Sequence, residues 1–212
     1  MNRILTALLI YAFLLTSQAN SQAVKSIGLK VGAISATQDW KYAQNVSSLD
    51  TKPRWGFDVG AFAEWFTLPV FSLTTELHYV QKGFSLKLPV TTEQFPDGNG
   101  AFMTLSPRVD YLSIPILAKC RLDWASSSLY AIAGPRIDFL VHHQDSGFGA
   151  VIDHFRSTEY GATIGIGYLL TQLVPFGLGA ELRYSPTLQE SYSTNLLAVR
   201  NSSFEMLILL TY

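Results

Sequence analysis

The sequence predicts an all-β protein, folded as an eight-stranded antiparallel up-and-down barrel that spans a membrane. Charged residues make up only 15% of the 212 residues and hydrophobic residues 48%, whereas typical globular domains are about 25% charged. Hydrophobic and polar residues alternate along most of the chain, which is typical of strands with two unlike faces. The connections alternate between long loops and tight turns, as expected of a barrel inserted into a membrane from one side.

Eight alternating segments bounded by turn residues are expected to form strands, and the pattern requires no helix. They span residues 25–36, 54–66, 70–83, 109–122, 127–141, 156–171, 175–186 and 202–212. The long connections are 37–53, 84–108, 142–155 and 187–201, and the short ones are 67–69, 123–126 and 172–174. We expect short periplasmic turns at one end of the barrel and long extracellular loops at the other.

One face of every predicted strand is free of charge, and the other face carries the charges. The charged faces hold Lys30, Asp58, Glu64, Glu76, His78, Lys82, Lys119, Arg121, Arg136, Asp138, Glu181, Arg183 and Glu205. A soluble lipocalin-like barrel would turn its apolar face inward around an apolar ligand, whereas a membrane barrel turns that face toward lipid. Aromatic residues at the ends of the apolar runs, such as Trp65, Tyr79 and Tyr168, favour the membrane arrangement.

The interior of an eight-stranded barrel is only wide enough for side chains to fill it. Six bases and six acids face inward, with His78 counted as neutral, so we expect paired ions that plug the lumen. A narrow proton or ion path is the alternative. The residues expected to form the structural charge network are Glu76, Arg121, Arg136, Glu181 and Arg183.

Pro115 and Pro135 lie inside predicted strands, where proline cannot donate a hydrogen bond to its neighbour. Because a closed barrel has no free edge, we expect a bulge or a strand end at each proline.

The outer loops hold the residues that most resemble a catalytic or metal site. His142, His143 and His154 lie near Asp145 and Asp153, and imidazole and carboxylate groups are common metal ligands. Adjacent histidines on a strand point to opposite faces, and no HExxH or GxSxG motif accompanies them. We interpret these residues as a polar rim and predict no catalytic, cofactor-binding or metal-binding residue.

The connection after the third strand contains the sequence Pro96-Asp97-Gly98-Asn99-Gly100. Asp-Gly and Asn-Gly steps favour tight turns, so part of this connection is expected to extend a hairpin above the membrane. Its residues Phe95, Phe102 and Met103 are expected either to pack within the loop or to contact a partner or ligand.

Residues 1–23 have the three parts of a cleaved secretory signal peptide. Arg3 precedes an apolar run from Ile4 to Leu15, and small residues before Ala19 and Ala23 offer cleavage sites. Twelve apolar-rich residues fall short of the roughly 20 that a spanning helix needs. The organisation expected is a signal peptide over 1–23 and one barrel domain over 24–212.

The composition also excludes several classes of protein. Fifteen Lys and Arg against sixteen Asp and Glu leave no basic field for a nucleic acid. Cys120 is the only cysteine, so the chain forms no internal disulfide and no Cys-rich zinc site.

Four segments carry a family resemblance: 28–32 (GLKVG), 76–83 (ELHYVQKG), 111–117 (YLSIPIL) and 133–136 (AGPR). In order and spacing they resemble the small outer-membrane β-barrel family that includes PorT-like proteins. The resemblance spans nearly the whole chain after the signal peptide. It implies a Gram-negative outer membrane and a final aromatic residue, Tyr212, read as the C-terminal assembly signal by the barrel-assembly machinery.

We therefore expect a non-enzymatic outer-membrane protein with a structural or interaction role in the cell envelope and no cofactor. Its expected contacts are outer-membrane lipid, the barrel-assembly machinery during insertion, and an envelope or secretion-system protein. The alternatives are a lipid-modifying hydrolase or acyltransferase at the rim, using His142 or His154, and a soluble carrier of an apolar ligand.

Overall fold

The computed structural model describes residues 24–42, 51–66, 68–90, 100–144, 147, 152, 154–171, 176–194 and 196–212. The predicted signal peptide, residues 1–23, lies outside these ranges. Every named element is a strand. The strands are β1 (Val24–Tyr42), β2 (Lys52–Trp65), β3 (Phe71–Pro89), β4 (Phe102–Leu105), β5 (Arg108–Asp123), β6 (Ser127–Gln144), β7 (Thr158–Leu170), β8 (Gly177–Pro186), β9 (Tyr192–Ser193) and β10 (Leu197–Thr211).

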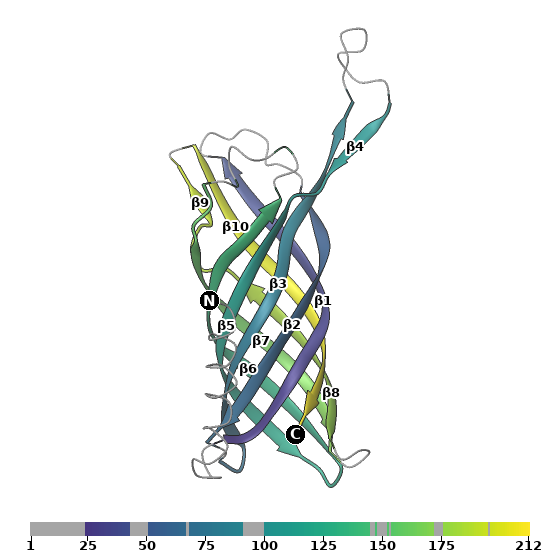
Figure 1. The fold of residues 1–212 in the computed structure, drawn as a ribbon, viewed down its shortest axis with the longest axis vertical. Coiled ribbons are helices and arrows are strands. Elements are labelled where there is room, and N and C mark those ends of the chain that lie inside the picture. The colour runs from purple at the N-terminus through teal and green to yellow at the C-terminus, as the bar shows by residue number, and fades with distance from the viewer. Residues whose placement is uncertain are drawn as a thin grey trace, which may run out of the picture.

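Eight of these strands form a closed antiparallel ring, as predicted (Figure 1). Their order around the ring is β1-β2-β3-β5-β6-β7-β8-β10, and β10 returns to pair with β1 from Gly28↔Thr211 to Tyr42↔Leu197. Ile27 and Tyr212 extend this seam by exchanging two backbone hydrogen bonds, of 3.1 and 2.8 Å. The ring therefore has no unpaired edge within the lipid, where an unsatisfied backbone group costs several kcal/mol.

The strands run further at the long-loop end than the alternation predicts. β1 continues to Tyr42, β3 continues to Pro89, and β10 begins at Leu197. The backbones stay paired beyond the part of each strand in which apolar and polar side chains alternate. The expected hairpin is confirmed: β4 pairs with the end of β3 from Leu86↔Leu105 to Pro89↔Phe102. This hairpin rises clear of the ring (Figure 1).

The expectation of a bulge or strand end at Pro115 and Pro135 is wrong. Pro115↔Arg136 and Ala118↔Ala133 are in the same β5–β6 register, and Pro135 pairs with Ala162 without a shift. Pairing of β3 with β5 stops at Thr75↔Ile116 and resumes in the same register at His78↔Ser113. The missing proline donors thus interrupt the ladders without displacing the strands, because the flanking pairs hold the register. The β5–β6 shift lies instead between Asp110 and Tyr111.

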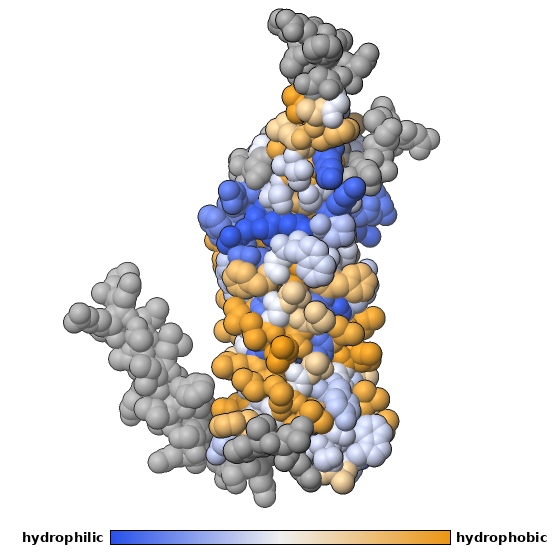
Figure 2. Space-filling model, turned by 90° about the vertical axis from the view of Figure 1, so that its right-hand side faces the viewer, coloured by the Kyte–Doolittle hydropathy of each residue, from blue (hydrophilic) through white to orange (hydrophobic). Residues whose placement is uncertain are grey.

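The apolar faces point outward and the charged faces inward, which excludes the lipocalin-like arrangement. The exposed apolar side chains include Leu29, Val31, Ile164, Ile166, Leu182, Met206, Ile208 and Leu210, whereas Lys30, Asp58, Glu76, Asp138, Glu181 and Arg183 are buried. On the face shown in Figure 2 the hydrophobic residues form a broad band across the barrel, and a band of hydrophilic residues lies above it toward the long-loop end. Among the described residues, no helix has the length and apolarity needed to cross a bilayer.

A charge placed on the belt should destabilise the barrel. Ile166 is 59% exposed on β7, and Ile166→Arg should lower the free energy of unfolding by about 2–4 kcal/mol if the residue lies near the bilayer midplane. The control is Leu188→Arg, because Leu188 is 66% exposed but follows β8 at the long-loop end. Guanidinium titration of both variants in lipid vesicles would measure the difference, and equal losses would contradict a lipid-facing belt.

Candidate functional site

The centre of the lumen holds an ion network that joins β1, β3 and β8. Lys30 Nζ donates to Glu76 Oε1 at 2.8 Å and to Glu181 Oε2 at 3.1 Å. Arg183 Nη2 lies 2.7 Å from Glu76 Oε2, and Arg183 Nε donates to Glu181. Strand alternation turns all four side chains inward, and all four are buried. Two cations and two carboxylates thus neutralise one another away from water.

Neutral and imidazole groups extend this central network. His78 Nε2 lies 2.9 Å from Glu76 Oε2, and its Nδ1 lies 2.6 Å from Asp58 Oδ1. The hydroxyl of Tyr130 donates to Glu181 at 2.7 Å. These contacts occupy the remaining carboxylate lone pairs, which a buried ion pair needs if it is not to destabilise the fold.

A second group lies nearer the long-loop end, around Asp138. Lys82 Nζ and Ser113 Oγ each donate to this carboxylate at 2.6 Å. Arg136 Nε lies 3.2 Å from the same carboxylate, and Arg136 Nη1 lies 4.0 Å from Glu205.

A third group lies at the short-turn end, around Glu64. Lys119 Nζ donates to Glu64 at 2.8 Å, and Arg121 Nη1 donates at 3.1 Å. Arg121 Nε also lies 3.1 Å from Asp123. Of the five residues expected to form one network, the fold brings together Glu76, Glu181 and Arg183 and places Arg136 and Arg121 in two other groups.

Sequence reasoning missed a buried carboxylate, Glu159 on β7. Its side chain accepts hydrogen bonds from the hydroxyl of Tyr111 at 2.8 Å and from Asn201 Nδ2 at 3.0 Å. Glu159 lies two residues before Gly161, which the sequence places on the inward face. Because residues two apart on a strand share a face, this spacing could have placed Glu159 in the lumen. A search for opposite charges could not find it, because these two partners are neutral.

The side chains leave almost no free space between the charged groups. Two voids of about 10 Å³ each lie among the described lumen residues, one beside Arg136 and Glu205 and the other beside Lys30 and Tyr130. Each has about the volume that one water requires. The lumen is therefore filled around the central network and Arg136, whereas a cavity of about 400 Å³ opens beside Glu64 and Arg121 at the short-turn end.

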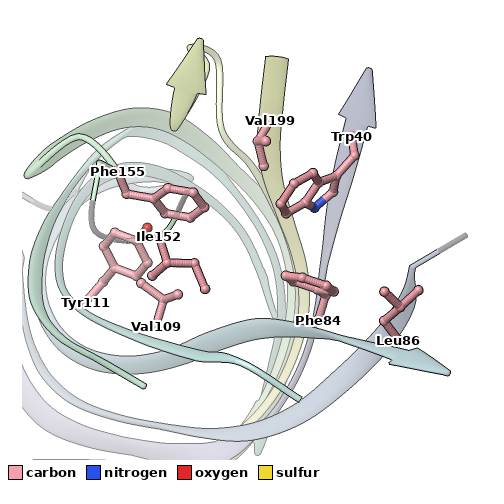
Figure 3. Packing of buried hydrophobic residues seen from close by; sticks show 8 residues of the cluster. All are labelled: Trp40, Phe84, Leu86, Val109, Tyr111, Ile152, Phe155 and Val199. Carbon is pink, nitrogen blue, oxygen red and sulfur yellow. The ribbon is translucent and has the colours of Figure 1, made fainter. Parts of the chain in front are cut away.

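An apolar cluster lies in the lumen at the long-loop end. Figure 3 shows Ile152 and Phe155, from the connection after β6, pointing into the ring toward Val109 and Tyr111. Trp40, Phe84, Leu86 and Val199 complete the cluster. Ile152 and Phe155 thus place apolar side chains in the lumen above Glu159.

The two adjacent rim histidines, His142 and His143, do not share a face of the sheet. On β6, His142 pairs with Asp110 and His143 with Val109, so these neighbours lie on opposite faces. Within the described ranges, no group of three His, Cys, Asp or Glu residues is arranged to hold a metal. Asp145 and Asp153 lie outside those ranges, so a hydrolase or acyltransferase at the rim stays a hypothesis.

Beyond the strands, one rim carboxylate has a shifted pKa. A hydrogen bond with Ser193, and a second with Arg200 at 3.4 Å, hold the pKa of Glu190 below its usual value.

A closed ring with an apolar exterior and a charged, filled interior defines an outer-membrane β-barrel protein. The family model described as outer membrane protein beta-barrel domain matches residues 17–193. The chain belongs to this family and is located in the bacterial outer membrane. A comparison with curated proteins gives no match.

Similar solved structures are also outer-membrane proteins. Ail of Yersinia pestis is 12% identical, with 88% of this chain and 98% of that chain covered and a TM-score of 0.40. The outer membrane protease OmpT of Escherichia coli is 8% identical, with coverages of 91% and 97% and a TM-score of 0.45. Neisserial surface protein A is 14% identical, with coverages of 85% and 95% and a TM-score of 0.39.

Removing the central carboxylate should destabilise the barrel strongly. Glu76→Gln keeps the side-chain shape but leaves Lys30 and Arg183 short of one negative charge, so the free energy of unfolding should fall by about 3–5 kcal/mol. Denaturant titration in lipid vesicles would measure this loss. Asp39→Asn is the control, because Asp39 pairs with Lys41 at 3.3 Å on the exposed surface and should change stability by less than about 1 kcal/mol. An unchanged Glu76→Gln barrel would show that the network does not stabilise the fold.

Proposed function

We propose that this protein is a non-enzymatic outer-membrane barrel with a structural or interaction role, and that it does not conduct solutes. The proposal rests on the centre of the lumen, where the voids beside the central network and beside Arg136 are only about 10 Å³ each, and on the apolar cluster at the long-loop end. A lumen filled in this way offers a solute no path. The role then falls to the surfaces that the barrel presents outside the membrane.

The β3–β4 hairpin is the surface that best supports an interaction role. Phe102 and Met103 on β4 are 68% and 47% exposed, and among the described strands β4 pairs only with β3. An isolated two-stranded hairpin is marginally stable in water, and exposed apolar side chains on a free strand mark interaction sites. The proposed contact is an envelope protein that covers this hairpin.

The sequence supports a proposal for how the protein is exported and oriented. In this proposal residues 1–23 serve as a cleaved secretory signal, and residues 24–212 form one domain in a Gram-negative outer membrane with the long loops outside. The barrel-assembly machinery reads Tyr212 during insertion. An envelope or secretion-system protein is the proposed partner.

The lumen should not conduct ions. In a planar lipid bilayer the purified protein should add no steady conductance above that of the protein-free bilayer, because the voids beside the central network and beside Arg136 hold about one water each. A water-filled porin in the same bilayer serves as the positive control. Stable conductance steps from the refolded barrel would contradict this proposal and indicate a narrow proton or ion path through the lumen.

The hairpin should be covered in cells. A photo-crosslinking amino acid at Phe102 should yield a discrete protein adduct, and Met103→Ser in the same chain should reduce its yield by several-fold, because it removes an exposed apolar contact. The matched control places the crosslinker at Leu196, which is 64% exposed beside β10 at the same end. Absence of an adduct at Phe102, or equal adducts at both positions, would contradict the interaction role.

A further inference from the structure

We propose that the outer face of β2, β3 and β5, at the long-loop end of the ring, is a binding site for the headgroup phosphate of an anionic membrane lipid. Five polar side chains form this site, which we call the arginine cluster. They are Arg54 on β2, Tyr79 and Gln81 on β3, and Arg108 and Asp110 on β5. The cluster stands at the upper edge of the apolar belt, beside the headgroups of the lipids that surround the barrel.

Asp110 is the acid of the cluster, and its carboxylate is already occupied. Arg108 donates to Oδ1 from Nε at 2.8 Å and to Oδ2 from Nη2 at 2.5 Å. The hydroxyl of Tyr79 donates to Oδ2 at 2.7 Å. The amide oxygen of Gln81 also accepts from Arg108 Nη2, at 2.8 Å. Both oxygens of Asp110 therefore have partners, and the carboxylate is committed to Arg108.

Arg54 is a second arginine, for which the fold provides no counter-ion. Among the described residues it forms no ion pair, and its buried Nη1 has no hydrogen-bond partner. Arg108 lies close enough to repel it, and the more distant Asp110 attracts it only weakly. Gly83 makes room for this side chain, because a Cβ at Gly83, whose φ is +140°, would lie 3.1 Å from Arg54 Cδ. The fold thus holds two like charges together, which is unfavourable unless an anion joins them.

The charges of the cluster sum to one positive charge among the described residues. Arg54 and Arg108 face the single carboxylate of Asp110. His142, which pairs with Asp110 across β5 and β6, adds no negative charge in either protonation state. Asp39, an exposed acid further along the neighbouring strand β1, pairs with Lys41 at 3.3 Å. A phosphodiester, which carries one negative charge, would neutralise the excess.

The surface below the cluster suits the acyl chains of a lipid. Phe57, Val59 and Leu77 point outward from β2 and β3 and are 45%, 44% and 49% exposed. The rings of Phe57 and Tyr79 lie 5.7 Å apart, between this apolar strip and the arginines. Such an aromatic level marks the membrane–water interface. A lipid can therefore place its chains on the strip and its phosphate on the arginines, whereas a free phosphate ion would use only the charged half.

The donor groups select an anionic phosphate over a zwitterionic headgroup. The planar guanidinium group presents paired N–H donors that match the oxygens of a phosphate, and the charge strengthens each hydrogen bond. Phosphatidylcholine carries its own cation beside the phosphate, so it would leave the charge excess of the cluster in place. Phosphatidylglycerol carries the phosphodiester alone and would remove that excess.

The test titrates phosphatidylglycerol into phosphatidylcholine nanodiscs that contain the full barrel. The side-chain Nε–H resonance of Arg108 and the amide resonance of Gly83 should shift saturably as the fraction of phosphatidylglycerol rises. Glycerophosphoglycerol, which has the same headgroup without acyl chains, should leave both resonances unchanged. Arg54→Gln should weaken the binding of phosphatidylglycerol about tenfold, the size expected for one hydrogen bond to a charged group.

The matched control is Lys52→Gln, because Lys52 is exposed on the same strand two residues from Arg54. It removes the same charge and should leave the affinity unchanged. Heat-modified gel migration checks that each variant is folded, as expected for Arg54→Gln because it relieves repulsion. Saturable binding that Arg54→Gln alone weakens supports the site. No saturable shift, equal affinities for the two variants, or equal shifts with glycerophosphoglycerol would each overturn the lipid site, the last by assigning it to a free phosphate.

Discussion

The seam between β1 and β10 is the constraint on which the rest of this structure depends. Lipid offers no hydrogen bonds to a strand edge, so the sheet must close on itself, and here it closes with eight strands. Eight strands set the width of the interior, which leaves room for side chains and little else. The outward apolar belt, the inward charges and the narrow lumen all follow from that closure, because period-two alternation assigns each residue to one side or the other.

The closed interior explains why its charges occur in satisfied groups. Glu76 meets two cations and an imidazole, and Asp138 meets Lys82, Arg136 and Ser113. Ions taken out of water are tolerated only when partners and hydrogen bonds replace their hydration. The two ends of the barrel differ: apolar side chains fill the lumen at the long-loop end, whereas a cavity lined partly by charged residues opens at the short-turn end. That asymmetry gives the molecule two chemically distinct faces.

Much of the architecture could be predicted because alternation and turn residues are local signals. The eight ring strands and the outward apolar faces follow from residues two apart, and the β3–β4 hairpin follows from its Asp-Gly and Asn-Gly steps. The partners within the lumen could not be predicted, since they depend on the register between strands far apart in the chain. Arg121 and Arg183 look equivalent in sequence, yet the first pairs with Glu64 and the second with Glu76. The prediction of a bulge or strand end at Pro115 was wrong because the neighbouring residue pairs hold the strands in register, although Pro115 has no backbone N–H to donate.

The central network also constrains how the barrel is assembled. Lys30 and Glu181 are 151 residues apart in sequence, and Glu76 and Arg183 are 107 apart, so neither contact can form before distant strands meet. Such non-local contacts slow folding because loop closure must precede them. A partly inserted sheet would expose these charges to lipid, and the cost of doing so opposes stepwise insertion of single strands. The charge groups therefore favour a concerted route in which closure of the ring and neutralisation of its interior occur together.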